Sequence, residues 1–253
     1  MRCITCIAYL KSLCVISFPV LVFIFCVFSL YNILSYDKYK KSTIKEKLEK
    51  IKLLNEYYKI LYSNINKLDI YFDFDGVIKD TMRHCSYLLL RLHGIDINLH
   101  SKFNVEDEKV VENFFKSMDW DYLLNISNEI NEAVSFIKLF QESVIFNPAI
   151  YSAVNSVSEM HKKCIFIEKN IGDISKKFNQ VHTPKLAVNN TDVLVDDTEY
   201  NLENWTGVPI HFDNGKDSMY YTISDFGELY YLANFNPESN NMEINMQRIY
   251  TKK

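Results

Sequence analysis

The sequence DIYFDFDGV, residues 69–77, decides the predicted fold, because an apolar, strand-forming stretch runs directly into two acids and a glycine. Side chains alternate along a strand, so Asp73 and Asp75 point to one side and Phe74 points to the other. Two carboxylates this close repel each other unless a cation lies between them, and Mg²⁺ prefers such oxygen ligands. Gly76 allows the chain to turn away where the strand ends. The stretch therefore predicts a metal-binding strand end.

A second apolar strand that ends in acids lies much further along the chain. Residues 192–197 read DVLVDD, so this strand ends in Asp196 and Asp197. In parallel α/β sheets the ligand site lies beyond the carboxyl ends of the strands. We therefore expect a parallel sheet in which this acid pair converges with Asp73 and Asp75 on one cation.

Together, FDFDGVIKDT (residues 72–81) and VLVDDTEYNLENW (residues 193–205) resemble the haloacid dehalogenase (HAD) superfamily of phosphotransferases. The acid pair, the N-x-x-x-W spacing and the following G-x-P-I further resemble the C-type 5′(3′)-deoxyribonucleotidases. The resemblance implies a three-layer, Rossmann-like α/β fold with a parallel sheet over residues 68–234. It also implies a Mg²⁺-dependent phosphomonoester hydrolase, most readily a 5′-nucleotidase.

The resemblance also assigns roles to the acids. Asp73 is the implied nucleophile, which forms an aspartyl-phosphate, and Asp75 protonates the leaving oxygen and later activates water. Mg²⁺ is implied to be held by Asp73, by the backbone carbonyl of Asp75, and by Asp196 and Asp197.

Enzymes of this kind also use a lysine to neutralise the phosphate and the nucleophile. Lys185 is favoured because it precedes Asp196 at close to the family's spacing and lies in a short apolar stretch after a proline. Lys176 and Lys177 are the alternatives, but they read as the exposed side of a helix over residues 171–180.

The remaining family element is a serine or threonine that donates to the phosphate at the end of the second strand. The stretch predicted as that strand, residues 164–167, ends instead in Glu168, whose charge would repel a phosphate. We therefore expect Lys169 or Asn170 to donate in its place, with Gly76 as a further phosphate-binding position.

Residues 82–145 read as helices, and an insert at this point resembles the family's helical cap. Such a cap can close over the site, exclude water and select the substrate. Phe114, Phe115, Trp120 and Tyr122 could stack a nucleotide base, and ordinary helix packing is the alternative.

The N-terminal segment predicts a membrane anchor within residues 1–37. Residues 13–34 form a run of 22 residues without a charge, which as a helix spans about 33 Å and can cross a bilayer. The run is longer than the apolar part of a signal peptide. A lysine cluster follows it, so the positive-inside rule predicts a single-pass protein whose catalytic domain faces the cytoplasm.

Residues 38–67 predict an amphipathic linker helix, because apolar residues recur every seven positions, at Ile44, Ile51 and Tyr58. This helix could pack on the body, lie on the membrane surface, or form a short coiled coil that makes a homodimer. Residues 235–253 predict a loose polar tail.

Charge narrows the choice of partners. The formal net charge is −4, but residues 69–253 alone carry 17 basic and 28 acidic residues. A body this acidic is a poor nucleic-acid binder, so a small phosphate ester is the expected ligand. Two rival functions stay open: a phosphatase of another small ester such as a sugar phosphate, and a catalytically weak protein that binds a ligand or partner.

Overall fold

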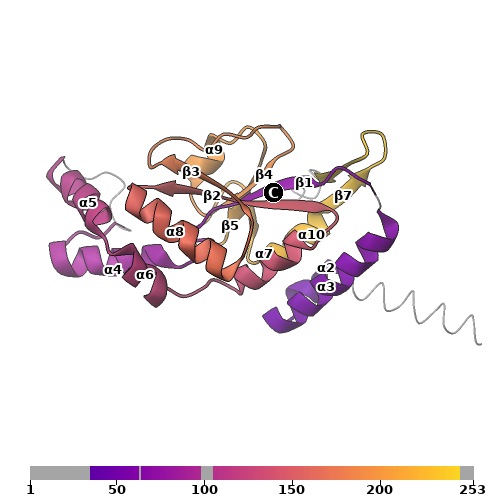
Figure 1. Cartoon of the computed structure of the whole chain (residues 1–253), viewed down its shortest axis with the longest axis horizontal. Helices are drawn as coiled ribbons and strands as arrows, with labels where there is room; N and C mark the ends of the chain where they lie inside the picture. Colours follow the sequence, from indigo (N-terminus) through magenta and orange to yellow (C-terminus); the bar gives the residue numbers. More distant parts are fainter. Residues whose placement is uncertain (1–34, 63, 98–104, 246–253) are drawn as a thin grey trace, which may run out of the picture.

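The computed structural model describes residues 35–62, 64–97 and 105–245, and their core is a six-stranded parallel sheet (Figure 1). Its strand order is β3-β2-β1-β4-β5-β6, with every neighbouring pair parallel. The strands are β1 (Leu68–Phe72), β2 (Phe146–Val154), β3 (Ser175–Gln180), β4 (Val193–Asp196), β5 (Val208–Phe212) and β6 (Tyr221–Ile223). The predicted Rossmann-like sheet is therefore present.

Helices cover both faces of this sheet (Figure 1). On one face lie α7 (Ala133–Gln141) and α8 (Val157–Asn170), and on the other lies α9 (Glu199–Glu203). Because both faces are covered, the central strands are buried on both sides and read as continuous apolar runs. Ile70 and Phe72 of β1 are fully buried, for example.

The two acid-bearing strands end side by side. Phe72, the last residue of β1, pairs with Val195 of β4. The N–H of the next residue, Asp73, donates to the Val195 carbonyl. On the other side of β1, Phe72 pairs with Ile150, and β2 then continues as far as Val154. The carboxyl ends of β1, β2 and β4 therefore form one contiguous edge.

Three helices between β1 and α7 form a cap at the end of the molecule beyond this edge (Figure 1). They are α4 (Thr81–His93), α5 (Val105–Ser117) and α6 (Trp120–Ile126). The cap has a small apolar core of its own, formed by Cys85, Leu89, Phe114, Trp120 and Leu123. Its two connections to the sheet domain pair with each other, since the Asp80 N–H donates to Asn128 and the Ile130 N–H donates to Ile78.

The N-terminal helices α2 (Tyr36–Lys40) and α3 (Ile44–Leu61) belong to the same body. Thr43 and Glu46 form a reciprocal capping box that starts α3. Ile51 and Leu54 are buried in the main core, and the Lys47 ammonium lies 2.7 Å from a buried Asp225 carboxylate. The apolar seam of α3 is thus buried within the chain, so of the alternatives that the sequence leaves open the structure shows packing on the body.

The predicted tail is wrong for the residues that the structure describes. Residues 233–244 form an antiparallel hairpin of β7 (Ala233–Asn236) and β8 (Asn241–Ile244), because Met242 and Ile244 bury their side chains in the core. Near it, the 3₁₀ helix η1 (Phe226–Glu228) leads into α10 (Leu229–Leu232). Residues 246–253 lie outside the described part.

The predicted transmembrane helix and the membrane localisation derived from it require correction. Across residues 35–62, 64–97 and 105–245, no helix is both long enough and apolar enough to span a bilayer. The 18-residue helix α3 is long enough, but it carries several lysines and glutamates. Residues 13–34 lie outside the described residues. The absence of charges in a segment is compatible with a bilayer, but it does not by itself establish a membrane-spanning helix. The described residues therefore form a Rossmann-like parallel sheet with a helical cap.

We expect Ile51→Ala to lower the free energy of unfolding by about 2–5 kcal/mol, because it removes a fully buried side chain and leaves a cavity. Ile60→Ala is the matched control on the same helix, since Ile60 is 82% exposed and its loss should change stability by about 0.5 kcal/mol or less. Urea denaturation measures both. Equal effects would show that α3 does not pack on the body.

Candidate active site

Three carboxylates gather at the shared edge of β1 and β4. Asp73, Asp196 and Asp197 each offer an oxygen, and these oxygens all lie within 4.8 Å of one another. Asp73 and Asp196 are buried and Asp197 is half-buried. The parallel pairing of the two strands brings the acids together despite their separation in the sequence.

The Lys185 ammonium bridges two of these acids. Its Nζ lies 2.7 Å from Asp73 Oδ1 and 2.6 Å from Asp196 Oδ2, and the side chain is fully buried. Burial lowers the pKa of Lys185, but the two carboxylates outweigh it and raise that pKa above its ordinary value. Lys185 therefore stays a cation and offsets one of the three negative charges.

The three carboxylates still repel one another in spite of the Lys185 charge, and their pKa values show it. Burial raises the pKa of Asp73 to about 7, Lys185 opposes the rise, and the Asp196 and Asp75 carboxylates add to it. Burial likewise raises the pKa of Asp197 well above its usual range, and the neighbouring carboxylates add to the effect. Three oxygen donors with a surplus of negative charge fit a hard divalent cation such as Mg²⁺.

Hydrogen bonds hold Asp196 by its carboxylate and Asp197 by its backbone carbonyl. The Thr198 N–H donates to Asp196 Oδ1 at 2.9 Å, and Asn201 Nδ2 donates to Asp196 Oδ2 at 3.0 Å. Asn214 Nδ2 donates to the Asp197 carbonyl at 2.9 Å.

Gly76 is required by both its conformation and its surroundings. Its φ is +77°, and a Cβ built there would lie 2.2 Å from Asp197 Oδ2. A larger residue would therefore displace one of the gathered acids. The structure places Gly76 against Asp197, and its predicted contact with a phosphate stays a prediction.

Asp75 is held from two sides. The Thr81 hydroxyl donates to Asp75 Oδ1 at 2.6 Å, and the Lys163 ammonium donates to Asp75 Oδ2. Thr81 is the first residue of the cap helix α4, whereas Lys163 lies in α8 of the sheet domain.

The second strand lies earlier in the chain than the sequence predicts. Residues 164–167 lie in α8, and the strand beside β1 is β2. Lys169 and Asn170 are therefore at the far end of a 14-residue helix, about 20 Å along its axis from the edge that holds Asp73. The prediction that they bind phosphate loses its geometric basis. Glu168 is exposed and pairs with Lys176 at 3.3 Å.

The alternative lysines are also placed differently from the prediction. Lys176 and Lys177 lie on β3, not on a helix. Lys177 Nζ donates to the Tyr71 hydroxyl at 3.0 Å and lies over that ring. Of the three candidate lysines, Lys185 is the one that contacts Asp73.

Sequence reasoning missed Ser152 and Lys163. Ser152 is buried near the end of β2, at the level of the acids that follow β1, and its hydroxyl accepts from Lys163 Nζ at 3.0 Å. A local signal existed, because Ser156-x-x-Glu159 is the pattern of a helix start and places a strand end just before it. Ser156 does cap α8, accepting from the Glu159 N–H.

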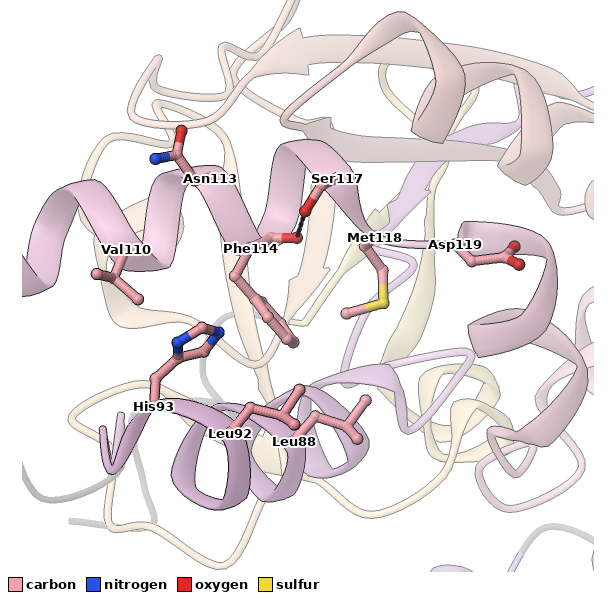
Figure 2. A pocket seen from close by; sticks show the side chains of 9 residues that line it. All are labelled: Leu88, Leu92, His93, Val110, Asn113, Phe114, Ser117, Met118 and Asp119. Atoms are coloured by element: carbon pink, nitrogen blue, oxygen red, sulfur yellow. Dashed lines mark hydrogen bonds between the residues drawn. The ribbon is translucent and has the colours of Figure 1, made fainter.

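A cavity of about 470 Å³ lies within the cap, away from these acids (Figure 2). Leu88 and Leu92 of α4 face Val110 and Phe114 of α5 across it. Its lining includes none of the gathered carboxylates or lysines, so it is not the centre of the proposed chemistry.

Comparison with known proteins adds little beyond this geometry. No family model and no curated protein matches the chain. A HAD-superfamily hydrolase, subfamily IA, from Geobacter sulfurreducens is similar in structure, with a TM-score of 0.40, 14% identity, and coverage of 66% of this chain and 96% of that one. A protein assigned as a beta-phosphoglucomutase from Bacteroides vulgatus has a TM-score of 0.37, 11% identity, and coverage of 69% and 85%. A functional assignment must therefore rest on the residues of the site.

We expect Mg²⁺ to stabilise the protein, and to do so more at pH 8 than at pH 6. Asp73 has a pKa of about 7, so acidification through that range protonates a carboxylate that the ion needs ionised. Without metal the sign reverses: this pKa is raised on folding, so ionising Asp73 as the pH rises destabilises the fold. At 100 times its dissociation constant the ion adds about 2.7 kcal/mol to the free energy of unfolding.

Urea denaturation with and without Mg²⁺ measures this gain. Asp197→Asn should remove most of it, whereas Asp217→Asn, at an exposed acid outside the cluster, should preserve it. A gain that survives Asp197→Asn unchanged would place the ion elsewhere.

Proposed function

We propose that the protein is a Mg²⁺-dependent phosphomonoester hydrolase of the HAD type that works through an aspartyl-phosphate. The convergence of Asp73, Asp75, Asp196, Asp197 and Lys185 at one edge of a parallel sheet carries this proposal. The four acids follow or end β1 and β4, and Lys185 lies in the loop between β3 and β4.

Asp73 is suited to be the nucleophile, because its buried carboxylate is held by Lys185 at the edge of the sheet. Its oxygen attacks phosphorus and forms an O–P bond, while the P–O bond to the leaving group breaks and Asp75 gives that oxygen its proton. Water then attacks the same phosphorus and gives a proton to Asp75, which releases inorganic phosphate and restores the Asp73 carboxylate. One water molecule is consumed in each cycle.

Charge neutralisation is the second requirement of this chemistry. Asp73, Asp196 and Asp197 would hold Mg²⁺, which when bound supplies positive charge for the phosphoryl oxygens. Lys185 contributes the fixed ammonium, and Ser152 supplies a hydroxyl at the neighbouring strand end. In this proposal Ser152 takes the phosphate-binding role that the sequence predicts for Lys169 or Asn170.

A 5′-nucleotide is the substrate class that we propose within this reaction. The stretch around Trp205 suggested it, but Trp205 itself is structural: its Nε1 donates to the buried Asp192 carbonyl at 2.9 Å. Among the cap aromatics, Trp120 and Phe114 are packed in the cap core, whereas Tyr122 is 56% exposed. A panel of nucleoside monophosphates and sugar phosphates, assayed by Mg²⁺-dependent phosphate release, tests the class directly.

We expect Asp73→Asn to abolish Mg²⁺-dependent phosphate release while the protein stays folded, because the amide is nearly isosteric but forms no acyl phosphate. Asp69→Asn is the control, since Asp69 lies on the same strand, bonds Asn147 and lies outside the acid cluster. Steady-state assays and thermal melting measure both. Unchanged turnover in Asp73→Asn would refute the mechanism.

We expect Ser152→Ala to reduce kcat/KM about 10- to 100-fold, through loss of a hydroxyl that binds the phosphoryl group in the transition state. Glu168→Thr should leave the kinetics unchanged, because Glu168 is exposed and pairs with Lys176. The two variants thus compare the strand end that the structure shows with the one expected from sequence. Altered kinetics in Glu168→Thr alone would favour the sequence-based placement.

A further inference from the structure

The side chain of Lys163 is fully buried and makes four polar contacts through one atom. Its Nζ lies 2.7 Å from Glu159 Oε1, 3.0 Å from Ser152 Oγ and 3.1 Å from the Ala153 carbonyl, and it donates to Asp75 Oδ2. Glu159 is itself buried, and its other oxygen accepts from the Asn155 backbone at 2.7 Å. The ammonium therefore has a single well-determined position.

Aromatic rings restrict that position further. The ammonium lies 5.4 Å from the ring centre of Phe74, which stands between the two motif acids, and 5.3 Å from that of Trp120 in the cap. The amine is thereby enclosed by the sheet domain and the cap. Two acids follow β1, and among the described residues each pairs with a different lysine. Lys163 contacts Asp75, whereas Lys185 contacts Asp73.

Packing alone would not favour this arrangement. Two carboxylates and an ammonium taken out of water lose more hydration than apolar side chains of the same volume would, and such groups can often be replaced by apolar ones without loss of stability. A structural role is therefore the weaker explanation for placing Glu159 and Lys163 on the buried face of α8.

We propose that Lys163, held by Glu159, is a positioning residue that fixes the Asp75 carboxyl group for proton transfer to the leaving oxygen. The inference rests on the proposed phosphatase function and deepens it. A general acid must lie within hydrogen-bond reach of the atom that it protonates. Thr81 fixes one Asp75 oxygen and Lys163 fixes the other, so rotation of the carboxyl group is prevented from both sides.

The test compares two substrates that differ in their need for this proton. The leaving group of p-nitrophenyl phosphate departs as a stable anion, whereas the alcohol of a nucleoside 5′-monophosphate needs a proton. The measured quantity is kcat/KM, which covers the steps up to departure of the leaving group. The double variant Lys163→Met with Glu159→Gln removes one charge of each sign, so the net charge of the Asp75, Glu159 and Lys163 cluster is unchanged and no unpaired Glu159 carboxylate is left buried.

We expect the double variant to lose about 100-fold or more in kcat/KM on the nucleotide and less than about tenfold on p-nitrophenyl phosphate, in keeping with typical general-acid contributions. Lys163→Gln with Glu159→Gln is the second variant should the first fail to fold, because it keeps polar side chains at both positions without an unpaired Glu159 charge, and the same difference between substrates is expected. In an Asp75→Asn background neither change should cost further activity, because the two residues act as a unit.

Lys162→Met is the matched control. Lys162 precedes Lys163 on α8 and pairs with Asp121 of the cap at 3.5 Å, so its loss should leave both substrates unaffected. Equal losses on the two substrates in a folded Lys163 variant would show a merely structural role and overturn the inference, as would unchanged kinetics. A wild-type protein inactive on every phosphate ester would overturn the proposed function itself, and the inference with it.

Discussion

The contact on which the site depends is the Lys185 ammonium buried between Asp73 and Asp196. The parallel sheet brings the carboxyl ends of β1 and β4 together, and with them three carboxylates whose repulsion would open that edge of the sheet. One buried cation offsets part of this charge and leaves a surplus suited to a divalent ion. The parallel sheet therefore causes the repulsion between the carboxylates, and Lys185, from the loop between β3 and β4, offsets part of it.

The two acids that follow β1 form ion pairs with different lysines. Lys185 contacts Asp73, and Lys163 contacts Asp75. The elements that carry these lysines are also different, since one is a loop and the other is the helix after β2. Two carboxylates only two residues apart therefore have separate environments: burial raises the pKa of Asp73, whereas Thr81 and Lys163 both donate hydrogen bonds to Asp75.

The sequence predicted the parts of this site whose signals are local. An apolar run that ends in acids identifies β1 and β4 without reference to any distant residue, whereas Lys185 is predicted only through the spacing to Asp196 that the family resemblance implies. The β2–α8 unit was misread for a physical reason. Residues 147 and 148 interrupt the apolar run of β2 with an asparagine and a proline. The buried face of α8 carries Glu159 and Lys163 at helical spacing, and that face has no hydrophobic period to recognise.

The burial of Glu159 and Lys163 is explained by the contact of Lys163 with Asp75. The sequence does not indicate this contact, because Asp75 lies far from both residues along the chain. The same limit applies to the N-terminal helices, whose amphipathic pattern fits packing on the body as well as it fits a dimer or a membrane surface. Only the contacts of Ile51 and Leu54 with the main core decide between them.

The position of Asp75 also connects the chemistry to the cap. Thr81, which bonds one of its oxygens, starts the first cap helix, and the two connections that join the cap to the sheet domain are hydrogen-bonded to each other directly beside it. Lys163, which bonds the other oxygen, belongs to the sheet domain. Asp75 is therefore held jointly by the cap, through Thr81, and by the sheet domain, through Lys163.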